Sequence, residues 1–398
     1  MSRIRTGAER ASEDIRLLGD GRIGLLTNFT GTLPDLSRTS DRLVAAGAPI
    51  SVLFGPEHGL NGSVQAGETE AESHDARTDL PIVETYLKSG AELDRVFQES
   101  GVSTIVFDMQ DLGVRFYTYI WTLYDALESA ARTGLRFVVL DRPNPLGGLL
   151  LEGPGLPDGS FASFVGRSDI HQRHGLTAGE LARLFAARDL AERGLTVDLA
   201  VVEVEGWSPG DDFDGTGLPW VPPSPNMPTL DTAFAFSGTG IFEGTNVSEG
   251  RGTTRPFEML GAPYIDGRLA SRLREAGLPG VVFREVWFAP TFHKYAGSTV
   301  RGVQLHVTDR DAFRPVSTGL AVLDAIAELY PDEFRFLPPG ERLDGPDRRH
   351  AIDLLWGSDE LRKTVEAGRP GSALIGPAAR VGDVYGPDVL LYPRVSAV

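Results

Sequence analysis

Carboxylic acids held between Gly and Pro are the residues of this chain best suited to chemistry. Glu57 lies in the segment Gly55-Pro-Glu-His-Gly59, and Asp111 and Glu249 lie in other Gly-containing segments. Glycoside cleavage needs one protonated carboxyl group and one ionised carboxylate, or a substitute for the latter. Glu57 is the leading acid candidate, because a turn at the edge of a sheet can desolvate a carboxyl group and keep it protonated. Asp111 and Glu249 are the leading partners.

Residues 238–256 form the most unusual stretch, with two Glu, two Arg, one Asn and five hydroxyl side chains spaced by Gly. No helix or strand periodicity is present, so we expect a loop that buries no apolar face. Gly permits close backbone approach, and the charges indicate a polar ligand. The predicted ligand-binding residues are Glu243, Asn246, Arg251 and Thr253. A mobile surface loop is the alternative interpretation.

Polar residues also follow four predicted strands of the first half. Ligands of open parallel sheets bind beyond the carboxyl ends of the strands, so these residues predict a polar cleft. The candidate ligand-binding residues from these segments and from a later Pro-rich stretch are Asn28, His58, Glu68, Arg115, Tyr117, Tyr119, Arg142 and Asn226.

Several of these side chains have structural alternatives. His58 could orient Glu57 or make a purely structural hydrogen bond. Asp108 and Asp141 could belong to the site or cap helices. Four aromatic residues could stack on a sugar, although aromatics near helix starts are more often core: Tyr117, Tyr119, Trp121 and Trp220.

Other chemistries lack their signatures. The first strand is followed by Asn28-Phe-Thr-Gly31 and not by a Gly-x-Gly-x-x-Gly fingerprint, which argues against a nicotinamide enzyme. No Walker loop, His-Glu-x-x-His helix or Gly-x-Ser-x-Gly elbow appears. The chain has no Cys, which removes thiolate nucleophiles and Cys-based zinc sites. His171 and His174 have metal-compatible spacing but no acidic cluster nearby, so an ordinary surface pair is expected. We expect neither a metal nor an organic cofactor.

Regular elements must position these groups. Short runs of Val, Ile, Leu and Phe predict strands at Arg22–Thr27, Ile50–Phe54, Thr104–Phe107, Phe137–Leu140 and Val197–Val204. Amphipathic segments near 36–46, 84–99, 121–133 and 177–193 predict the helices between them. Buried strands that alternate with helices indicate an α/β fold with a Rossmann-like parallel sheet. Thr177-Ala-Gly-Glu180 predicts a capping box, and Leu181, Leu184 and Phe185 then form a buried helix face.

At 398 residues the chain is long enough for two domains. The Pro-rich segment Leu218–Pro228 is the predicted junction, which gives a Rossmann-like domain at 1–217 and a smaller α+β domain at 218–398. The second domain is expected to have helices near 266–276, 311–329 and 358–367, with strands near 281–288 and 300–308. The active site is expected between the domains.

The net charge of −17 argues against nucleic acid as the main partner. No run of 18 apolar residues predicts a membrane span, and no apolar signal segment follows Met1. A cytoplasmic location is therefore the default expectation. Composition leaves the oligomeric state open.

Six motifs resemble the exo-β-N-acetylmuramidase family typified by NamZ. They are Leu53–Gly59, Phe107–Asp111, Arg115–Tyr119, Leu140–Pro145, Ser224–Thr229 and Glu243–Thr254. The resemblance runs from about Arg22 to Tyr330 and more weakly to the end. It implies a glycosidase that removes terminal N-acetylmuramic acid from the non-reducing end of peptidoglycan fragments, without a cofactor. It also implies that Glu57 is the catalytic carboxylate.

The substrate implied by the resemblance carries a lactyl carboxylate, so its site should contain a cation. Arg115, Arg142, Arg251 and Arg255 lie in the motif segments and could select muramic acid over N-acetylglucosamine. Bacillus-type members look secreted, whereas the start of this chain favours salvage of imported muropeptides. A non-catalytic sugar-binding protein and a hexosaminidase of other specificity are the alternatives. Retaining, inverting and substrate-assisted mechanisms all stay open.

Overall fold

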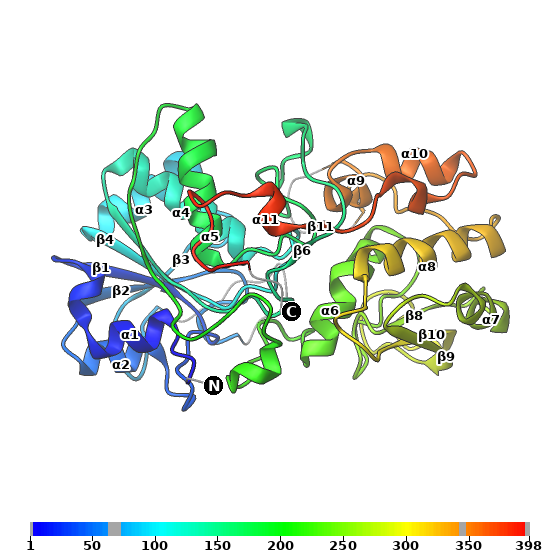
Figure 1. Cartoon of the computed structure of the whole chain (residues 1–398), viewed down its shortest axis with the longest axis horizontal. Helices are drawn as coiled ribbons and strands as arrows, with labels where there is room; N and C mark the ends of the chain where they lie inside the picture. The colour runs from blue at the N-terminus through cyan, green and yellow to red at the C-terminus, as the bar shows by residue number, and fades with distance from the viewer. Residues whose placement is uncertain (1–2, 63–72, 342–347, 395–398) are drawn as a thin grey trace.

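A six-stranded parallel sheet forms the first half of the chain in the computed structural model, which describes residues 3–62, 73–341 and 348–394 (Figure 1). The strand order is β3-β2-β1-β4-β5-β7. The strands are β1 (Ile23–Thr27), β2 (Ile50–Gly55), β3 (Ile82–Glu84), β4 (Thr104–Asp108), β5 (Arg136–Leu140) and β7 (Asp198–Val202). All five predicted strands are confirmed. The additional strand, β3, has three half-buried residues at the edge of the sheet and gives no continuous apolar run.

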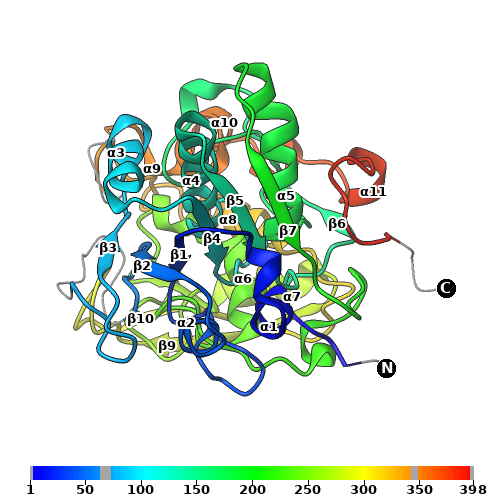
Figure 2. The same cartoon turned by 90° about the vertical axis from the view of Figure 1, so that its left-hand side faces the viewer.

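Helices cover both faces of this sheet. Helices α1 (Gly7–Glu13) and α2 (Thr39–Ala45) lie on one face, and α3 (Gly90–Ser100), α4 (Tyr119–Thr133) and α5 (Ala178–Leu184) lie on the other (Figures 1 and 2). Every residue of β1 and β4 is buried as a result. Such strands read as unbroken apolar runs. The predicted α/β, Rossmann-like class is confirmed.

The start of α5 has the predicted capping box. The Thr177 hydroxyl accepts a hydrogen bond from the Glu180 N–H, and the Glu180 carboxylate accepts one from the Thr177 N–H. The Asp141 carboxylate, at the end of β5, accepts hydrogen bonds from the Thr177 hydroxyl (2.7 Å) and the Gly179 N–H (2.8 Å). Asp141 therefore takes the helix-capping role. Burial raises the pKa of Asp141 to about 6.

The second half of the chain builds a smaller lobe around an antiparallel sheet of order β8-β10-β9. Its elements are α6 (Leu230–Thr239), β8 (Met259–Ala262), α7 (Gly267–Ala276), β9 (Val281–Phe288), β10 (Val300–Val307), α8 (Pro315–Leu329), α9 (Ala351–Trp356) and α10 (Glu360–Glu366). Helices α6 and α8 meet at Gly238 and Gly319. A Cβ on Gly238 would lie 1.9 Å from the Pro315 carbonyl oxygen, so only Gly allows this approach.

The end of the chain returns to the first lobe. Strand β11 (Ala379–Arg380) pairs with β6 (Leu150–Leu151), and α11 (Val381–Val384) follows. The Tyr392 hydroxyl then donates to the Asp141 carboxylate (2.6 Å). The division of the chain at residues 217 and 218 stays a prediction. In the part of the chain described here, no helix combines the length and the apolar composition that crossing a bilayer requires.

Asp141 should give the protein a measurable pH dependence. Its folded-state pKa of about 6 exceeds the ordinary 3.8, so the folded protein keeps a proton that the unfolded chain releases. The stability from this group is complete below pH 4 and is lost as the pH rises through 6. Asp141→Asn, which stays neutral, should therefore gain about 3 kcal/mol relative to wild type between pH 4 and pH 7. Denaturant unfolding at a series of pH values measures this difference.

The exposed Asp20→Asn variant is the control for loss of one carboxylate. If the difference between Asp141→Asn and wild type stays constant with pH, Asp141 is not held neutral by burial.

Candidate active site

Glu57 lies in a tight turn directly after β2. His58 and Gly59 both adopt left-handed backbone conformations, with φ of 69° and 72°. A positive φ is uncommon for a residue with a Cβ, and such strain gathers at functional sites. His58 is buried beside Glu57. The proposed choice between an orienting and a structural role for His58 stays open.

Two hydroxyl groups hold the buried carboxyl group of Glu57. The Tyr86 hydroxyl donates to Oε1 (3.1 Å), and the Thr118 hydroxyl donates to Oε2. Thr118 is the residue before α4, so two separate loops fix the carboxyl plane. A hydroxyl group can donate or accept. The pair can therefore hold Glu57 in both protonation states that an acid–base cycle requires.

Two tyrosines join this turn to the Pro-rich segment. The hydroxyl groups of Tyr117 and Tyr119 both donate to the Pro223 carbonyl oxygen at 2.7 Å. Burial, together with the charge of Glu57, raises the pKa of both phenols above the usual range. The Asn28 side chain lies beside the Tyr119 hydroxyl. Glu57, Asn28, Tyr117 and Tyr119 are thus brought together, as the positions of their strands predicted.

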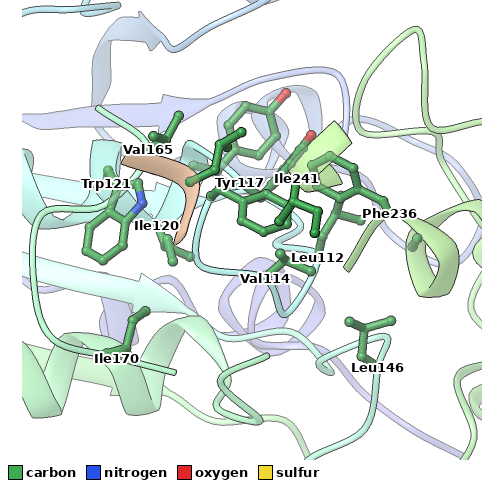
Figure 3. Close-up of a cluster of buried hydrophobic side chains, with 14 of the residues drawn as sticks. Leu112, Val114, Tyr117, Ile120, Trp121, Leu146, Val165, Ile170, Phe236 and Ile241 are labelled. Atoms are coloured by element: carbon green, nitrogen blue, oxygen red, sulfur yellow. The ribbon is translucent and has the colours of Figure 1, made fainter. Parts of the chain in front are cut away.

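Trp121 and both tyrosines are also core residues, which is the structural alternative for aromatics near helix starts. Figure 3 shows Trp121 and Tyr117 in the buried cluster. Trp220 differs from them, because it is half-buried and lines a hollow with Arg142. Its indole N–H donates to the Met227 carbonyl (3.1 Å).

Arg142 forms a buried ion pair at the end of β4. Its Nε donates to Asp108 Oδ1 (2.7 Å), and its Nη2 donates to the Thr32 carbonyl (3.0 Å). Asp108 is fully buried and makes this pair instead of capping a helix. Arg142 therefore stands at the carboxyl edge of the sheet, beside Trp220 and Gln110.

Asp111 is the second acid of this region. Its Oδ2 accepts from the Gly113 N–H (2.7 Å) and contacts His174 Nε2 (3.1 Å). Its charge acts on the Tyr117 hydroxyl together with that of Glu57, so both acids face the same phenol. The expectation that His174 belongs to a surface pair is wrong, because its ring is fully buried against Asp111. Within residues 3–62, 73–341 and 348–394, no three His, Asp or Glu side chains are placed to hold a metal.

The segment at 238–256 departs from the expected open loop. It begins with the last turn of α6 and a 3₁₀ helix at Gly240–Gly244. Ile241, Phe242 and Val247 are buried. The expectation that this segment buries no apolar face is therefore wrong, because its small and apolar residues pack against α9, where a Cβ on Gly244 would lie 2.6 Å from the Ile352 nitrogen. We call residues 240–256 the Gly-rich loop.

Charged side chains of the Gly-rich loop pair with one another. Arg251 donates to Glu243 Oε1 from Nη2 (2.6 Å), and its guanidinium lies 5.0 Å from the centre of the Phe257 ring. Glu249 is buried and accepts from Lys294 Nζ (2.9 Å). This ion pair holds the loop in place, so Glu249 has a structural task beside the predicted catalytic one.

The other predicted binding residues are distributed as follows. Asn246 bonds to the Glu333 carbonyl (2.8 Å), to Tyr264 (2.9 Å) and to the Arg335 N–H (3.1 Å), which makes it a structural hub of the second lobe. Thr253 and Asn226 line one open groove. Glu68 lies outside the described residues.

A row of aromatic contacts connects the two lobes at the site. Tyr117 lies 6.4 Å from Phe236 of α6 between ring centres, and Phe236 lies 4.6 Å from Phe257. The Arg251 guanidinium in turn lies over the Phe257 ring. Figure 3 shows Tyr117 and Phe236 in one buried cluster with Ile241 of the Gly-rich loop. The acids of the sheet and the Gly-rich loop are thus held by continuous packing.

The predicted contact of Arg115 with substrate is contradicted by its surroundings. Arg115 is fully buried, and its guanidinium donates to four carbonyl oxygens. These belong to Pro154, Ile170, Leu355 and Trp356. Burial lowers the pKa of Arg115 to about 10. Arg115 therefore links the first lobe to α9. Both of its terminal nitrogens donate to carbonyl oxygens of the protein, so neither is available to a sugar.

Three residues of the site were not named as candidates from the sequence. Tyr86 follows an edge strand, and Thr118 sits inside an aromatic run that looked like helix core. Lys294 lies 45 positions from Glu249, with which it pairs. Thr118 belongs to the family motif Arg115–Tyr119, and this motif was the sequence feature that pointed to it.

Two acids, a pair of buried phenols and a buried cation at the edge of a Rossmann-like sheet define the class. This is an α/β protein equipped for acid–base chemistry on a polar ligand. The chain belongs to the exo-β-N-acetylmuramidase NamZ family. The N-terminal model of that family matches residues 23–231, and its C-terminal model matches residues 234–378.

Individual relatives agree with this assignment. The peptidoglycan β-N-acetylmuramidase NamZ of Bacillus subtilis is 43% identical over 369 residues, which cover 92% of this chain and 85% of the relative. Two crystal structures of DUF1343 family proteins from Bacteroides fragilis are similar. One is 33% identical with a TM-score of 0.82, and 94% of each chain is covered. The other is 26% identical with a TM-score of 0.69, covering 94% of this chain and 93% of that one.

Replacing Arg115 by Met should destabilise the fold, with no selective effect on substrate. The change removes the hydrogen bonds of four buried carbonyls, and we expect a loss of about 3 kcal/mol or more in the free energy of unfolding. Denaturant unfolding measures this. Arg255→Met is the matched control, because its half-exposed guanidinium pairs with Glu258 at 3.3 Å and should contribute less than about 1 kcal/mol. A stable Arg115→Met protein that loses only substrate affinity would reinstate the direct contact.

Proposed function

We propose that this protein is an exo-acting glycoside hydrolase that releases non-reducing terminal N-acetylmuramic acid from peptidoglycan fragments. The observation that carries the proposal is the carboxyl group of Glu57, buried and fixed by two hydroxyls at the sheet edge. It belongs to a chain that resembles a named β-N-acetylmuramidase along nearly its whole length. Muropeptides and the disaccharide of muramic acid and N-acetylglucosamine are the proposed substrates.

In the proposed mechanism Glu57 acts as the acid. Its proton passes to the glycosidic oxygen as the bond from that oxygen to the anomeric carbon breaks. Positive charge then develops on the sugar ring, and the Asp111 carboxylate stabilises it. Water supplies the hydroxyl group of the product, and its proton returns to Glu57.

Asp111 is the preferred partner for a structural reason. Asp111 Oδ1 has no hydrogen-bond partner among the described residues, whereas Oδ2 is fixed by Gly113 and His174. One oxygen is therefore oriented, and the other is a buried acceptor that is not satisfied, which is a feature of functional sites. Glu249 instead accepts a hydrogen bond from the Lys294 ammonium group.

Arg142 is the proposed partner of the lactyl carboxylate that distinguishes muramic acid from N-acetylglucosamine. It is the cation at the carboxyl edge of the sheet, and it lines a hollow with Trp220 and Gln110. A guanidinium can pair with Asp108 through one edge and present another N–H to a second carboxylate.

Glu57→Gln should abolish turnover while leaving the fold and sugar binding in place. Gln has the same shape and can still bond to Tyr86 and Thr118, but it cannot transfer a proton. We expect kcat on a chromogenic muramide to fall by about 100-fold or more. Glu99→Gln, on the exposed side of α3, is the control and should keep full activity. A wild-type protein that binds the muramide without cleaving it would identify a sugar-binding protein instead.

Arg142→Met should reduce the preference for the muramide over the matching N-acetylglucosaminide. Loss of a charge-assisted hydrogen bond predicts a fall of about tenfold to a hundredfold in the ratio of the two kcat/KM values. Arg142→Lys keeps the charge beside Asp108 and should lose less, which separates selectivity from folding. Equal losses on both sugars, or none, would contradict the assignment.

A further inference from the structure

The loop between β9 and β10 is joined to the Gly-rich loop by hydrogen bonds. Lys294 Nζ donates to the carbonyl oxygens of Phe242 (2.8 Å) and Val247 (3.0 Å), besides pairing with Glu249. A single ammonium group thus holds three points of a loop that has little regular structure. This contact fixes where the β9–β10 loop stands relative to the site.

The same loop also meets Gly252 backbone to backbone. The Thr291 N–H and hydroxyl both donate to the Gly252 carbonyl, each at 3.0 Å. A Cβ on Gly252 would lie 2.8 Å from the backbone nitrogens of Thr291 and Phe292, and its φ is +79°. Only Gly permits this approach. The main chain is therefore pinned, and the Phe292 side chain remains 36% exposed.

Phe292 forms one wall of an open groove of about 570 Å³. The same groove is lined by Asn226 of the Pro-rich segment and by Thr253 and Thr254 of the Gly-rich loop. An exposed aromatic ring in one groove with hydroxyl and amide groups suits a pyranose, whose ring has apolar C–H faces and an equatorial rim of polar groups.

The Pro-rich segment connects the groove to the acid site. Asn226 follows Pro223 by three positions, and the Pro223 carbonyl is the shared acceptor of Tyr117 and Tyr119. These phenols lie within electrostatic reach of Glu57. An exo-acting enzyme must enclose the terminal sugar and leave the rest of the substrate an exit. Glu57 is buried whereas the groove is open, which is the arrangement expected if the groove receives the leaving group.

We propose that this groove is the leaving-group subsite, with Phe292 as the platform on which the sugar next to the terminal residue stacks. The inference rests on the proposed glycosidase activity and names the part of the chain that recognises the released sugar. It makes Phe292 a specificity-determining residue, although it takes no part in bond cleavage.

The test compares two substrates that differ only in the leaving group. One is the disaccharide of muramic acid and N-acetylglucosamine, and the other is the β-fluoride of N-acetylmuramic acid, whose leaving group is too small to reach a platform. Phe292→Ala should lower kcat/KM for the disaccharide about tenfold relative to the fluoride. Phe292→Tyr should restore most of the loss, because it keeps the ring. Val282→Ala, at an exposed position of β9, is the control and should change neither value.

The outcomes separate failure of the Phe292 platform from failure of the proposed glycosidase activity. Equal losses on both substrates would assign Phe292 to the fold, and no loss on either would leave the groove without a sugar. Both results overturn the platform. A wild-type protein that cleaves neither substrate would overturn the proposed function itself, which is a separate failure.

Discussion

The buried guanidinium of Arg115 is the constraint on which the arrangement of the site depends. Among the described residues it makes no ion pair with a carboxylate, and its terminal nitrogens instead donate to carbonyl oxygens from both lobes. A buried cation in such a position is tolerated only while those carbonyls stay in place, since an unpaired charge is costly in the interior. Arg115 begins the segment that carries Tyr117, Thr118 and Tyr119. The contact that fixes α9 therefore also fixes the residues around Glu57.

Internal pairing explains how an acidic protein keeps cations at its site. The net charge of −17 predicts no general attraction for an anionic sugar, yet Arg142 and Arg251 each lie against an acid in the interior. Fixed pairs of this kind present oriented N–H groups without a strong net field. In the proposed binding mode, recognition of a carboxylate rests on the geometry of one guanidinium, which tolerates salt better than a surface patch does.

Most of the sheet could be predicted from sequence because its inner strands are buried on both faces. The pattern predicted five of the six strands within about two residues, including β7 at one edge, and the capping box of α5 was found from four residues. Strand β3 and helix α9 were missed because each is short and depends on tertiary contacts. The Gly-rich loop was predicted to bind a ligand, and its burial of Phe242 was not expected. Small residues packed against a helix from a distant part of the chain leave no periodic signal.

The sequence predicted the positions of the candidate site residues better than it predicted what each of them contacts. Strand ends located Asn28, Glu57 and Asp111 correctly, since parallel strands end at one edge. Roles depend on partners far away in sequence. Arg115 and Arg142 are the same residue type in similar motifs, yet the first meets four carbonyls and the second meets a carboxylate. Nothing in the local pattern distinguishes them.

The point where the strand order reverses, between β1 and β4, shows how a dinucleotide-type sheet serves a different chemistry. A nucleotide-binding protein leaves this position to glycines, so that a pyrophosphate can approach the backbone. Here Asn28 follows β1 and accepts hydrogen bonds from the N–H (2.9 Å) and the hydroxyl (2.6 Å) of Thr30, which closes the turn with side chains. Gly31 has no free space either, because a Cβ there would lie 2.3 Å from the Thr27 hydroxyl oxygen. Side chains therefore fill the position that a phosphate would take. Glu57 and Asp111 lie at the same edge of the sheet.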